Sequence, residues 1–212
     1  MKVPKTINSA ISGFYAVLDR DDEELARTLL AAGAKVLQLR IKPSVPPGAG
    51  ELVRIARMCR TLCDAAGAAL IINDRIDVAI AAVADGVHLG QTDLGLRDAR
   101  RIVGDRLWIG ISTHTLAQVT LARAGGADYL GFGPVYATRT KKNPDPVQGL
   151  TGLRAAVAMA GGVPVVAIGG IAPEHAPGVW ATGAAAICAI GAVNDSGDVV
   201  GNAQRLHRNW VS

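Results

Sequence analysis

The sequence predicts a closed parallel (β/α)₈ barrel, a TIM barrel, formed as a single domain by residues 1–212. Three observations lead to this prediction. Short apolar segments alternate with amphipathic helical segments along the whole chain, a short phrase recurs where a helix passes into a strand, and no linker or low-complexity tract interrupts the alternation. An open doubly wound sheet is the alternative arrangement for the same alternation.

The predicted strands are short and almost entirely apolar, as strands covered by helices on both faces must be. They cover residues 14–18, 36–40, 69–73, 86–89, 107–111, 129–132, 165–168 and 185–189. Most are preceded by a glycine, which takes the left-handed conformation that ends a helix at little cost. The junction phrases begin at Gly33, Gly67, Asp85, Gly126 and Gly183.

The predicted helices fill the intervals between these strands. The first, residues 21–32, places Leu25, Leu29 and Leu30 on one face and four acidic residues in its first turn, where the helix dipole favours anions. Similar patterns cover residues 51–66, 77–84, 96–103, 116–124, 151–160, 173–182 and 199–210. Eight helices and eight strands in alternation favour the barrel.

The composition excludes several classes of protein. Half of the residues are hydrophobic and 19% are charged, which is typical of one well-cored domain. Three cysteines without C-x-x-C spacing predict a reducing, cytoplasmic location. No apolar stretch is long enough for a signal peptide or a membrane span, so we expect neither secretion nor a membrane partner. The net charge of +4 is scattered, which argues against nucleic acid and is compatible with anionic small molecules.

Polar side chains follow the second predicted strand at alternate positions. Gln38, Arg40 and Lys42 should therefore point the same way and form one electropositive wall. The alternative is that each cation simply leaves the strand into solvent. Burial of a glutamine and an arginine among apolar neighbours is unfavourable unless a partner binds them, which favours a site for an anion.

Carboxylates follow the third and fourth strands. Asp74 and Asp93 emerge at the same end of neighbouring strands, where two carboxylates can hold one Mg²⁺ together with water and substrate phosphate oxygens. The alternative for Asp74 is that it caps the next helix, because aspartate is a favoured N-cap residue. The nearby cations favour metal-assisted phosphate chemistry.

The residues that follow the sixth, seventh and eighth predicted strands indicate a phosphate-binding site. The loop from Gly133 to Asn143 offers hydroxyls and cations, and the glycine turns at Gly170 and Gly191 allow backbone N–H groups to approach an anion. His88 lies inside a strand, where a hydrogen-bonded core residue is the expected role, whereas His114 lies at the functional edge. The sequence has no pattern for a catalytic triad, so nothing indicates a protein nucleophile.

Five segments occur in an order that carries a family resemblance. They are Gln38-Leu39-Arg40-x-Lys42, Asn73-Asp74-Arg75, Gly86-Val87-His88-Leu89-Gly90-Gln91-x-Asp93, Gly133-Pro134-Val135-Tyr136-Ala137-Thr138-x-Thr140-Lys141 and Ile168-Gly169-Gly170-Ile171. Together they resemble the thiamine-phosphate synthase family, over about residues 15–193.

The resemblance implies a TIM-barrel transferase that joins hydroxymethylpyrimidine diphosphate to a thiazole phosphate, giving thiamine phosphate and diphosphate with Mg²⁺ as cofactor. It implies that Asp74 and Asp93 bind the metal and that Ser112 contacts the leaving diphosphate. The pyrimidine diphosphate is expected to contact Gln38, Arg40, Lys42, Asn73 and Lys141. The thiazole phosphate is expected to contact Thr138, Thr140, Gly170, Ile190 and Gly191.

Among these residues, we expect Arg40, Lys42, Ser112 and Lys141 to act in catalysis. If diphosphate leaves first, a pyrimidine-methyl cation remains, and catalysis requires stabilisation of the departing negative charge. This dissociative route explains why no nucleophile is evident. The thiazole nitrogen then attacks the cation that is held beside it.

The chain departs from the family pattern at two positions. Ile41 stands where a glutamate is usual, and Gly191 stands where a serine is common. We expect Ile41 to face away from Arg40 and Lys42, and Gly191 to alter affinity for the thiazole phosphate. Two alternative functions are a thiazole tautomerase, which would need a histidine within residues 133–135, and a phosphate-binding barrel without catalysis, which should have lost diphosphate or metal ligands.

Overall fold

The computed structural model describes residues 6–42, 47–138 and 145–207. Eight parallel strands pair in chain order and close into a barrel, because β8 pairs with β1. The strands are β1 (Gly13–Leu18), β2 (Val36–Leu39), β3 (Ala69–Asn73), β4 (Gly86–Leu89), β5 (Trp108–Thr113), β6 (Tyr129–Phe132), β7 (Val165–Ile168) and β8 (Ala186–Cys188). The predicted (β/α)₈ barrel is thus confirmed, and the open sheet is wrong.

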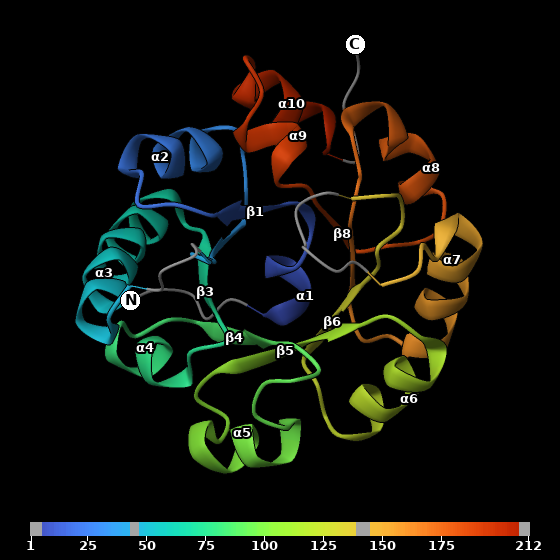
Figure 1. The fold of residues 1–212 in the computed structure, drawn as a ribbon, viewed down its shortest axis with the longest axis horizontal. Helices are drawn as coiled ribbons and strands as arrows, with labels where there is room; N and C mark the ends of the chain where they lie inside the picture. The colour runs from blue at the N-terminus through green and yellow to red at the C-terminus, as the bar shows by residue number, and fades with distance from the viewer. Residues whose placement is uncertain (1–5, 43–46, 139–144, 208–212) are drawn as a thin grey trace.

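Helices surround the barrel in a ring (Figure 1). They are α2 (Glu23–Ala31), α3 (Ala49–Ala66), α4 (Ile76–Ala81), α5 (Leu96–Val103), α6 (Leu116–Ala124), α7 (Gly149–Ala160), α8 (Ala176–Trp180) and α10 (Val199–Arg205). Asp22 caps α2 by accepting a hydrogen bond from the Leu25 N–H, so the acidic first turn begins as the sequence predicts. Among the described residues, no helix combines the length and the apolar character needed to cross a membrane.

Two helical predictions need correction. The predicted helix 173–182 consists of a 3₁₀ turn, η1 (Pro173–His175), followed by α8, because prolines at 173 and 177 lack the N–H that a continuous helix uses. The predicted helix 199–210 ends at Arg205, and residues 208–212 lie outside the described residues.

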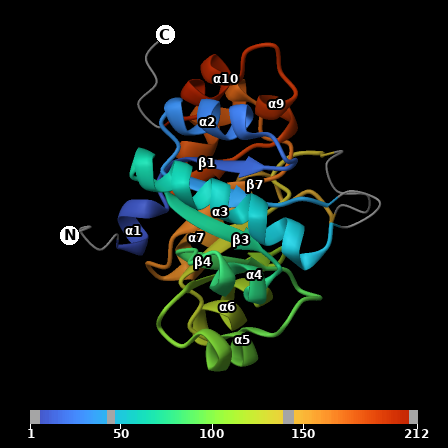
Figure 2. The ribbon, with the colours of Figure 1, turned by 90° about the vertical axis from the view of Figure 1, so that its left-hand side faces the viewer.

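Two short helices were not predicted, α1 (Ile7–Ala10) and α9 (Gly191–Asn194). The first lies across the amino-terminal opening of the barrel, where Ala10 and Ile11 pack with interior side chains from the starts of the strands. In Figure 2, α1 lies at one end of the molecule and the strand β1 points away from it. The second directly follows β8 at the opposite end.

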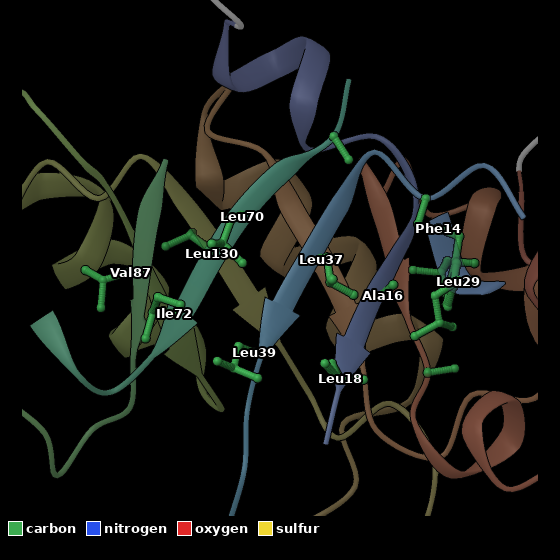
Figure 3. Packing of buried hydrophobic residues seen from close by; sticks show 14 of the residues in the cluster. Phe14, Ala16, Leu18, Leu29, Leu37, Leu39, Leu70, Ile72, Val87 and Leu130 are labelled. Carbon is green, nitrogen blue, oxygen red and sulfur yellow. The ribbon is translucent and has the colours of Figure 1, made fainter. Parts of the chain in front are cut away.

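Side chains of each strand alternate between two separate cores. Phe14, Ala16 and Leu18 of β1 belong to the outer core between the strands and the helices, shown in Figure 3. Tyr15 and Val17 belong to the inner core within the barrel. The inner core fills the barrel toward the amino ends of the strands, and the cavity found among the described residues lies toward their carboxyl ends.

Candidate active site

The site is a cavity of about 650 Å³ at the carboxyl ends of the strands. Every strand contributes to its walls, and every predicted site residue that the structure describes lines it. These residues are Gln38, Arg40, Lys42, Asn73, Asp74, Asp93, Ser112, Thr138, Gly170, Ile190 and Gly191. The two other predicted site residues, Thr140 and Lys141, lie outside the described residues.

The electropositive wall of Gln38, Arg40 and Lys42 forms because the hydrogen bonding between strands continues past the end of β2. The Arg40 N–H donates to the Leu18 carbonyl at 2.8 Å, so the alternation of the strand extends toward Lys42. Gln38, Arg40 and Lys42 all line the cavity. Ile41 packs instead against the outer core, so it faces away from the two cations.

Asp74 joins this wall to the end of β3. Lys42 Nζ lies 2.8 Å from Asp74 Oδ2. Asp74 takes the left-handed backbone conformation, with φ of 61°, and its N–H donates to the His88 carbonyl at 2.8 Å. The N-cap residue of α4 is Arg75, and no side chain caps this helix. The capping interpretation of Asp74 is therefore wrong, and the strained conformation aims its carboxylate into the cavity.

Asp93 lies beside Asp74, and both line the cavity. Asp93 Oδ2 accepts a hydrogen bond from the Gly90 N–H at 2.7 Å, which holds the carboxylate at the end of β4. Burial raises the pKa of Asp74, Lys42 opposes this shift, and the proximity of Asp93 raises the pKa further. Two neighbouring carboxylates repel each other as anions, so a divalent cation between them would relieve the repulsion.

The donor set matches a hard cation that keeps some of its water. Among the described residues, no group of three or more histidine, cysteine, aspartate or glutamate side chains could hold a metal ion. A site with two carboxylates leaves coordination positions for water and phosphate oxygens, which is how Mg²⁺ is commonly bound. Asp74 and Asp93 therefore fit Mg²⁺ and do not resemble a closed structural metal site.

Glycine turns bring the later loops together on the other side of the cavity. Gly170 has φ of 64°, and a Cβ atom there would lie 2.2 Å from the Ala137 carbonyl oxygen. Because Gly170 has no Cβ atom, the loop after β6 approaches the loop after β7 more closely than any other residue at position 170 would permit. The Tyr136 N–H donates to the Gly169 carbonyl at 2.9 Å, which fixes this approach. Thr138 and Gly170 consequently line the same cavity.

His114 also lines the cavity, as its position after β5 predicts. Its Nδ1 lies 2.6 Å from the Gly133 carbonyl oxygen, and its Nε2 lies 3.4 Å from Asp145 Oδ2. The imidazole thereby connects the loop after β5 to the loop after β6.

Three polar residues lie in the cavity floor, and the two tyrosines among them were not predicted as site residues. Tyr15, Tyr129 and His88 line the cavity, and the hydroxyl groups of the two tyrosines lie 2.9 Å apart. The predicted role of His88 as a hydrogen-bonded residue is confirmed, since its ring nitrogens contact Tyr129 and Ser112. Burial, with a smaller effect of Arg40, lowers the pKa of His88 to about 4, so the imidazole is neutral near pH 7. The available signal was a tyrosine inside an apolar strand, whose buried hydroxyl needs a partner.

Comparison with known proteins identifies the family. The family model described as thiamine monophosphate synthase matches residues 10–193. The thiamine-phosphate synthase of Moorella thermoacetica is 45% identical over 183 residues, which cover 86% of this chain and 85% of the relative. The thiamine-phosphate synthase of Methanocella arvoryzae is 44% identical over 183 residues, covering 86% of this chain and 84% of the relative.

Solved structures agree with this match. A thiamine phosphate pyrophosphorylase from Pyrococcus furiosus superposes with a TM-score of 0.84 and 36% identity, covering 93% of this chain and 94% of that chain. A 3-hexulose-6-phosphate synthase, at 18% identity and a TM-score of 0.66, shares the fold alone. The family match and the sequence identity extend over most of the chain, so this chain belongs to the thiamine monophosphate synthase family of transferases.

Proposed function

We propose that this chain joins hydroxymethylpyrimidine diphosphate to a thiazole phosphate, releasing diphosphate and forming thiamine phosphate. The observation that carries the proposal is the composition of one cavity. The cations Arg40 and Lys42 and the carboxylates Asp74 and Asp93 line it together with the hydroxyl and glycine groups of the later loops. A cavity of this size and chemistry suits two phosphorylated ligands that must lie side by side.

The diphosphate of the pyrimidine substrate is assigned to the side of the cavity formed by β2 to β5. Arg40 and Lys42 supply positive charge, Asn73 supplies an amide, and Ser112 supplies a hydroxyl. Asp74 and Asp93 would hold Mg²⁺, which when bound supplies positive charge to the departing diphosphate. Gln38 lies deeper, in the strand itself, and is 5% exposed, so it is assigned to the pyrimidine ring.

The reaction begins with cleavage of the bond between the pyrimidine methylene carbon and the diphosphate oxygen. The electron pair leaves with diphosphate, and Arg40, Lys42 and Ser112 stabilise the negative charge as it develops. The methylene cation that remains is attacked by the thiazole nitrogen, which forms the new C–N bond. Apolar side chains such as Val17 and Val166 line the cavity floor and exclude water, which would otherwise capture the cation.

The thiazole phosphate is assigned to the opposite side, where Thr138, Gly170, Ile190 and Gly191 line the cavity. Family resemblance adds Thr140 to this group and adds Lys141 to the contacts of the pyrimidine diphosphate, and both residues lie outside the described part of the chain. Gly191 keeps a backbone N–H and lacks the hydroxyl that a serine would add, so we expect weaker binding of the thiazole phosphate than a serine would give.

We further propose that the enzyme acts in the cytoplasm on small phosphorylated molecules, without nucleic acid or membrane partners. Three cysteines without C-x-x-C spacing support a reducing compartment. The charged groups that converge in one cavity support small anions as the ligands.

The decisive experiment mixes the purified protein with both substrates and Mg²⁺ and measures thiamine phosphate by chromatography. We expect product with Mg²⁺ and none after addition of EDTA, with activity restored by excess Mg²⁺. Absence of product under all conditions, with thiazole phosphate still bound, would refute the synthase assignment and favour a barrel without catalysis.

A further inference from the structure

A continuous chain of hydrogen bonds crosses the floor of the cavity. Gln38 Nε2 lies 2.9 Å from the Tyr15 hydroxyl, which lies 2.9 Å from the Tyr129 hydroxyl. The Tyr129 hydroxyl lies 3.0 Å from His88 Nδ1, and His88 Nε2 lies 2.9 Å from Ser112 Oγ. All four contacts have hydrogen-bond length, and five strands contribute one residue each. We call these five residues the floor chain.

The backbone around the floor chain is shaped to admit it. Gly110 of β5 pairs in register with both His88 of β4 and Tyr129 of β6. A Cβ atom at position 110 would lie 2.1 Å from Cζ of Tyr129, so any other residue would displace the tyrosine ring. The floor chain therefore depends on Gly110, because the absence of a side chain at this position leaves room for the Tyr129 ring.

The chemistry of the donors gives the floor chain a direction. Gln38 Nε2 can only donate, so the Tyr15 oxygen accepts and its own proton goes to Tyr129. The Tyr129 proton then goes to His88 Nδ1. A neutral imidazole that accepts at Nδ1 carries its proton at Nε2, so His88 donates to Ser112 Oγ. The Ser112 proton is then available to the cavity.

The opposite direction would have the opposite consequence. If Ser112 donated to His88, only lone pairs of the serine oxygen would face the cavity, and these repel an anionic oxygen. The direction inferred from Gln38 presents a hydroxyl proton, which is the group that a departing diphosphate requires. Tyr15 and Tyr129 are buried, so water does not compete for the hydrogen bond between their hydroxyl groups.

We propose that the floor chain fixes the Ser112 hydroxyl as a hydrogen-bond donor to the departing diphosphate, with Tyr15, Tyr129 and His88 as positioning residues. This inference rests on the proposed function. It also connects the two substrate contacts: Gln38, assigned to the pyrimidine ring, lies at one end, and Ser112, assigned to the diphosphate, lies at the other.

The first test reads the tautomer of His88 in the protein without substrates. Nitrogen-15 NMR of histidine-labelled protein should show the proton of His88 on Nε2, with the signal assigned by its loss in a His88→Gln variant. Tyr129→Phe removes one hydroxyl from the middle of the floor chain and keeps the aromatic ring. Because His88 Nδ1 loses its partner in this variant, we expect a mixture of the two His88 tautomers. A proton on Nδ1 in the unaltered protein would overturn the proposal.

The second test measures kinetics in a double-mutant cycle. We expect Tyr129→Phe to lower kcat on the order of tenfold, as for one hydrogen bond lost in the transition state, with KM within about twofold. In a Ser112→Ala background the same change should have no further effect, because Tyr129 acts through the serine. Additive effects of the two substitutions would overturn the proposal.

A matched control removes a different buried hydroxyl. Thr113 Oγ1 donates to the Gly131 carbonyl at 2.9 Å and does not line the cavity, so Thr113→Val should leave kcat unchanged. An equal loss of kcat in Thr113→Val and Tyr129→Phe would indicate a general structural effect and overturn the proposal. If the unaltered protein forms no thiamine phosphate, the proposed function fails, whereas the tautomer still decides the direction of the floor chain.

Discussion

Aspartates stand beside cations at both ends of the barrel, and their surroundings differ in one respect. At the amino end, Asp85 precedes β4, and its Oδ2 accepts hydrogen bonds from the Leu70 N–H at 2.7 Å and from Arg60 Nη1 at 2.6 Å. This carboxylate ties a strand, its neighbour and helix α3 together. The Asp85 carboxylate therefore accepts its hydrogen bonds from groups of the protein itself.

The same arrangement recurs before β6. Asp128 Oδ2 accepts hydrogen bonds from the Ile109 N–H at 2.7 Å and from Arg100 Nη2 at 2.5 Å. Strand, neighbouring strand and preceding helix are again joined by one carboxylate oxygen. We call each of these aspartate–arginine pairs, Asp85 with Arg60 and Asp128 with Arg100, a clamp. The two clamps precede alternate strands and stabilise the amino end of the barrel.

At the carboxyl end, the carboxylates of Asp74 and Asp93 lie beside each other. Lys42 approaches Asp74 at 2.8 Å, and the pKa of Asp74 is nevertheless raised by burial and by Asp93. The carboxyl end of the barrel brings two carboxylates together, whereas at the amino end Asp85 and Asp128 each pair with an arginine. This incomplete neutralisation favours Asp74 and Asp93, rather than Asp85 and Asp128, as functional carboxylates.

The largest effect should follow from removing a carboxylate at the carboxyl end. We expect Asp93→Ala to abolish formation of thiamine phosphate, while the free energy of unfolding falls by only about 1 kcal/mol, for the lost Gly90 contact. Enzyme assay and urea unfolding check the two parts. As a control, Asp98→Ala, at an exposed pair with Arg101 on α5, should change neither. An unchanged rate in Asp93→Ala would refute the metal assignment.

Removal of Lys141, which the family resemblance assigns to the pyrimidine diphosphate, should have the next largest effect. We expect Lys141→Ala to raise the activation free energy by about 2–4 kcal/mol, as for loss of one charge-stabilising donor. Steady-state kcat/KM measures the change, and Lys35→Ala, an exposed lysine at the amino end, is the control. A rate within twofold of the unaltered enzyme would remove Lys141 from the site.

At the amino end, the reverse pattern is expected. Asp85→Ala should lower the free energy of unfolding by about 3 kcal/mol, because it leaves the Leu70 N–H and the Arg60 guanidinium without this partner. The Arg60 side chain is 15% exposed, so water replaces the carboxylate poorly. The folded variant should retain its kcat. A stability unchanged within 0.5 kcal/mol, the range typical of surface substitutions, would show that the clamp is not needed.

Acid should weaken the fold through His88. Its pKa is about 4 in the folded protein and about 6.5 when unfolded, so the unfolded chain binds the proton more readily. This contribution to stability is complete above about pH 6.5 and decreases as the pH falls toward 4, by about 2 kcal/mol between pH 7 and 5. Urea unfolding of His88→Gln should show a correspondingly smaller loss over that interval. Parallel curves for both proteins would contradict the assignment.

The smallest effect concerns backbone strain. Asp74 and Val83 are the two non-glycine residues with positive φ among the described residues, at 61° and 51°. Val83 precedes β4 at the amino end, and it is 77% exposed. Val83→Gly should therefore raise the free energy of unfolding by about 1 kcal/mol without altering kcat. Thermal unfolding measures this, and a lower melting temperature would show that the valine makes a stabilising contact.

The sequence predicted the strands and the outer helices because their apolar periodicity is local. It also placed Gln38, Arg40, Asp74 and Asp93 together, because the carboxyl ends of all strands in a parallel barrel meet at one face. The expected role of Ser112 came from a family resemblance, whereas the glycine turns of the later loops already indicated a phosphate site.

The remainder depended on information that no local pattern carries. Helix α1 spans four residues, too few for a helical period, and it forms by packing into the barrel. The Tyr15–Tyr129 contact joins residues 114 positions apart, and it requires the register of several strands. Gly110 was predicted only as part of an apolar strand, although its missing side chain makes room for Tyr129.

The position of α1 also bears on how ligands reach the cavity. Ala10 and Ile11 pack among the interior side chains at the amino-terminal opening of the barrel, whereas the cavity lies at the carboxyl ends of the strands. We therefore expect both proposed substrates to enter, and both products to leave, from the carboxyl side of the barrel.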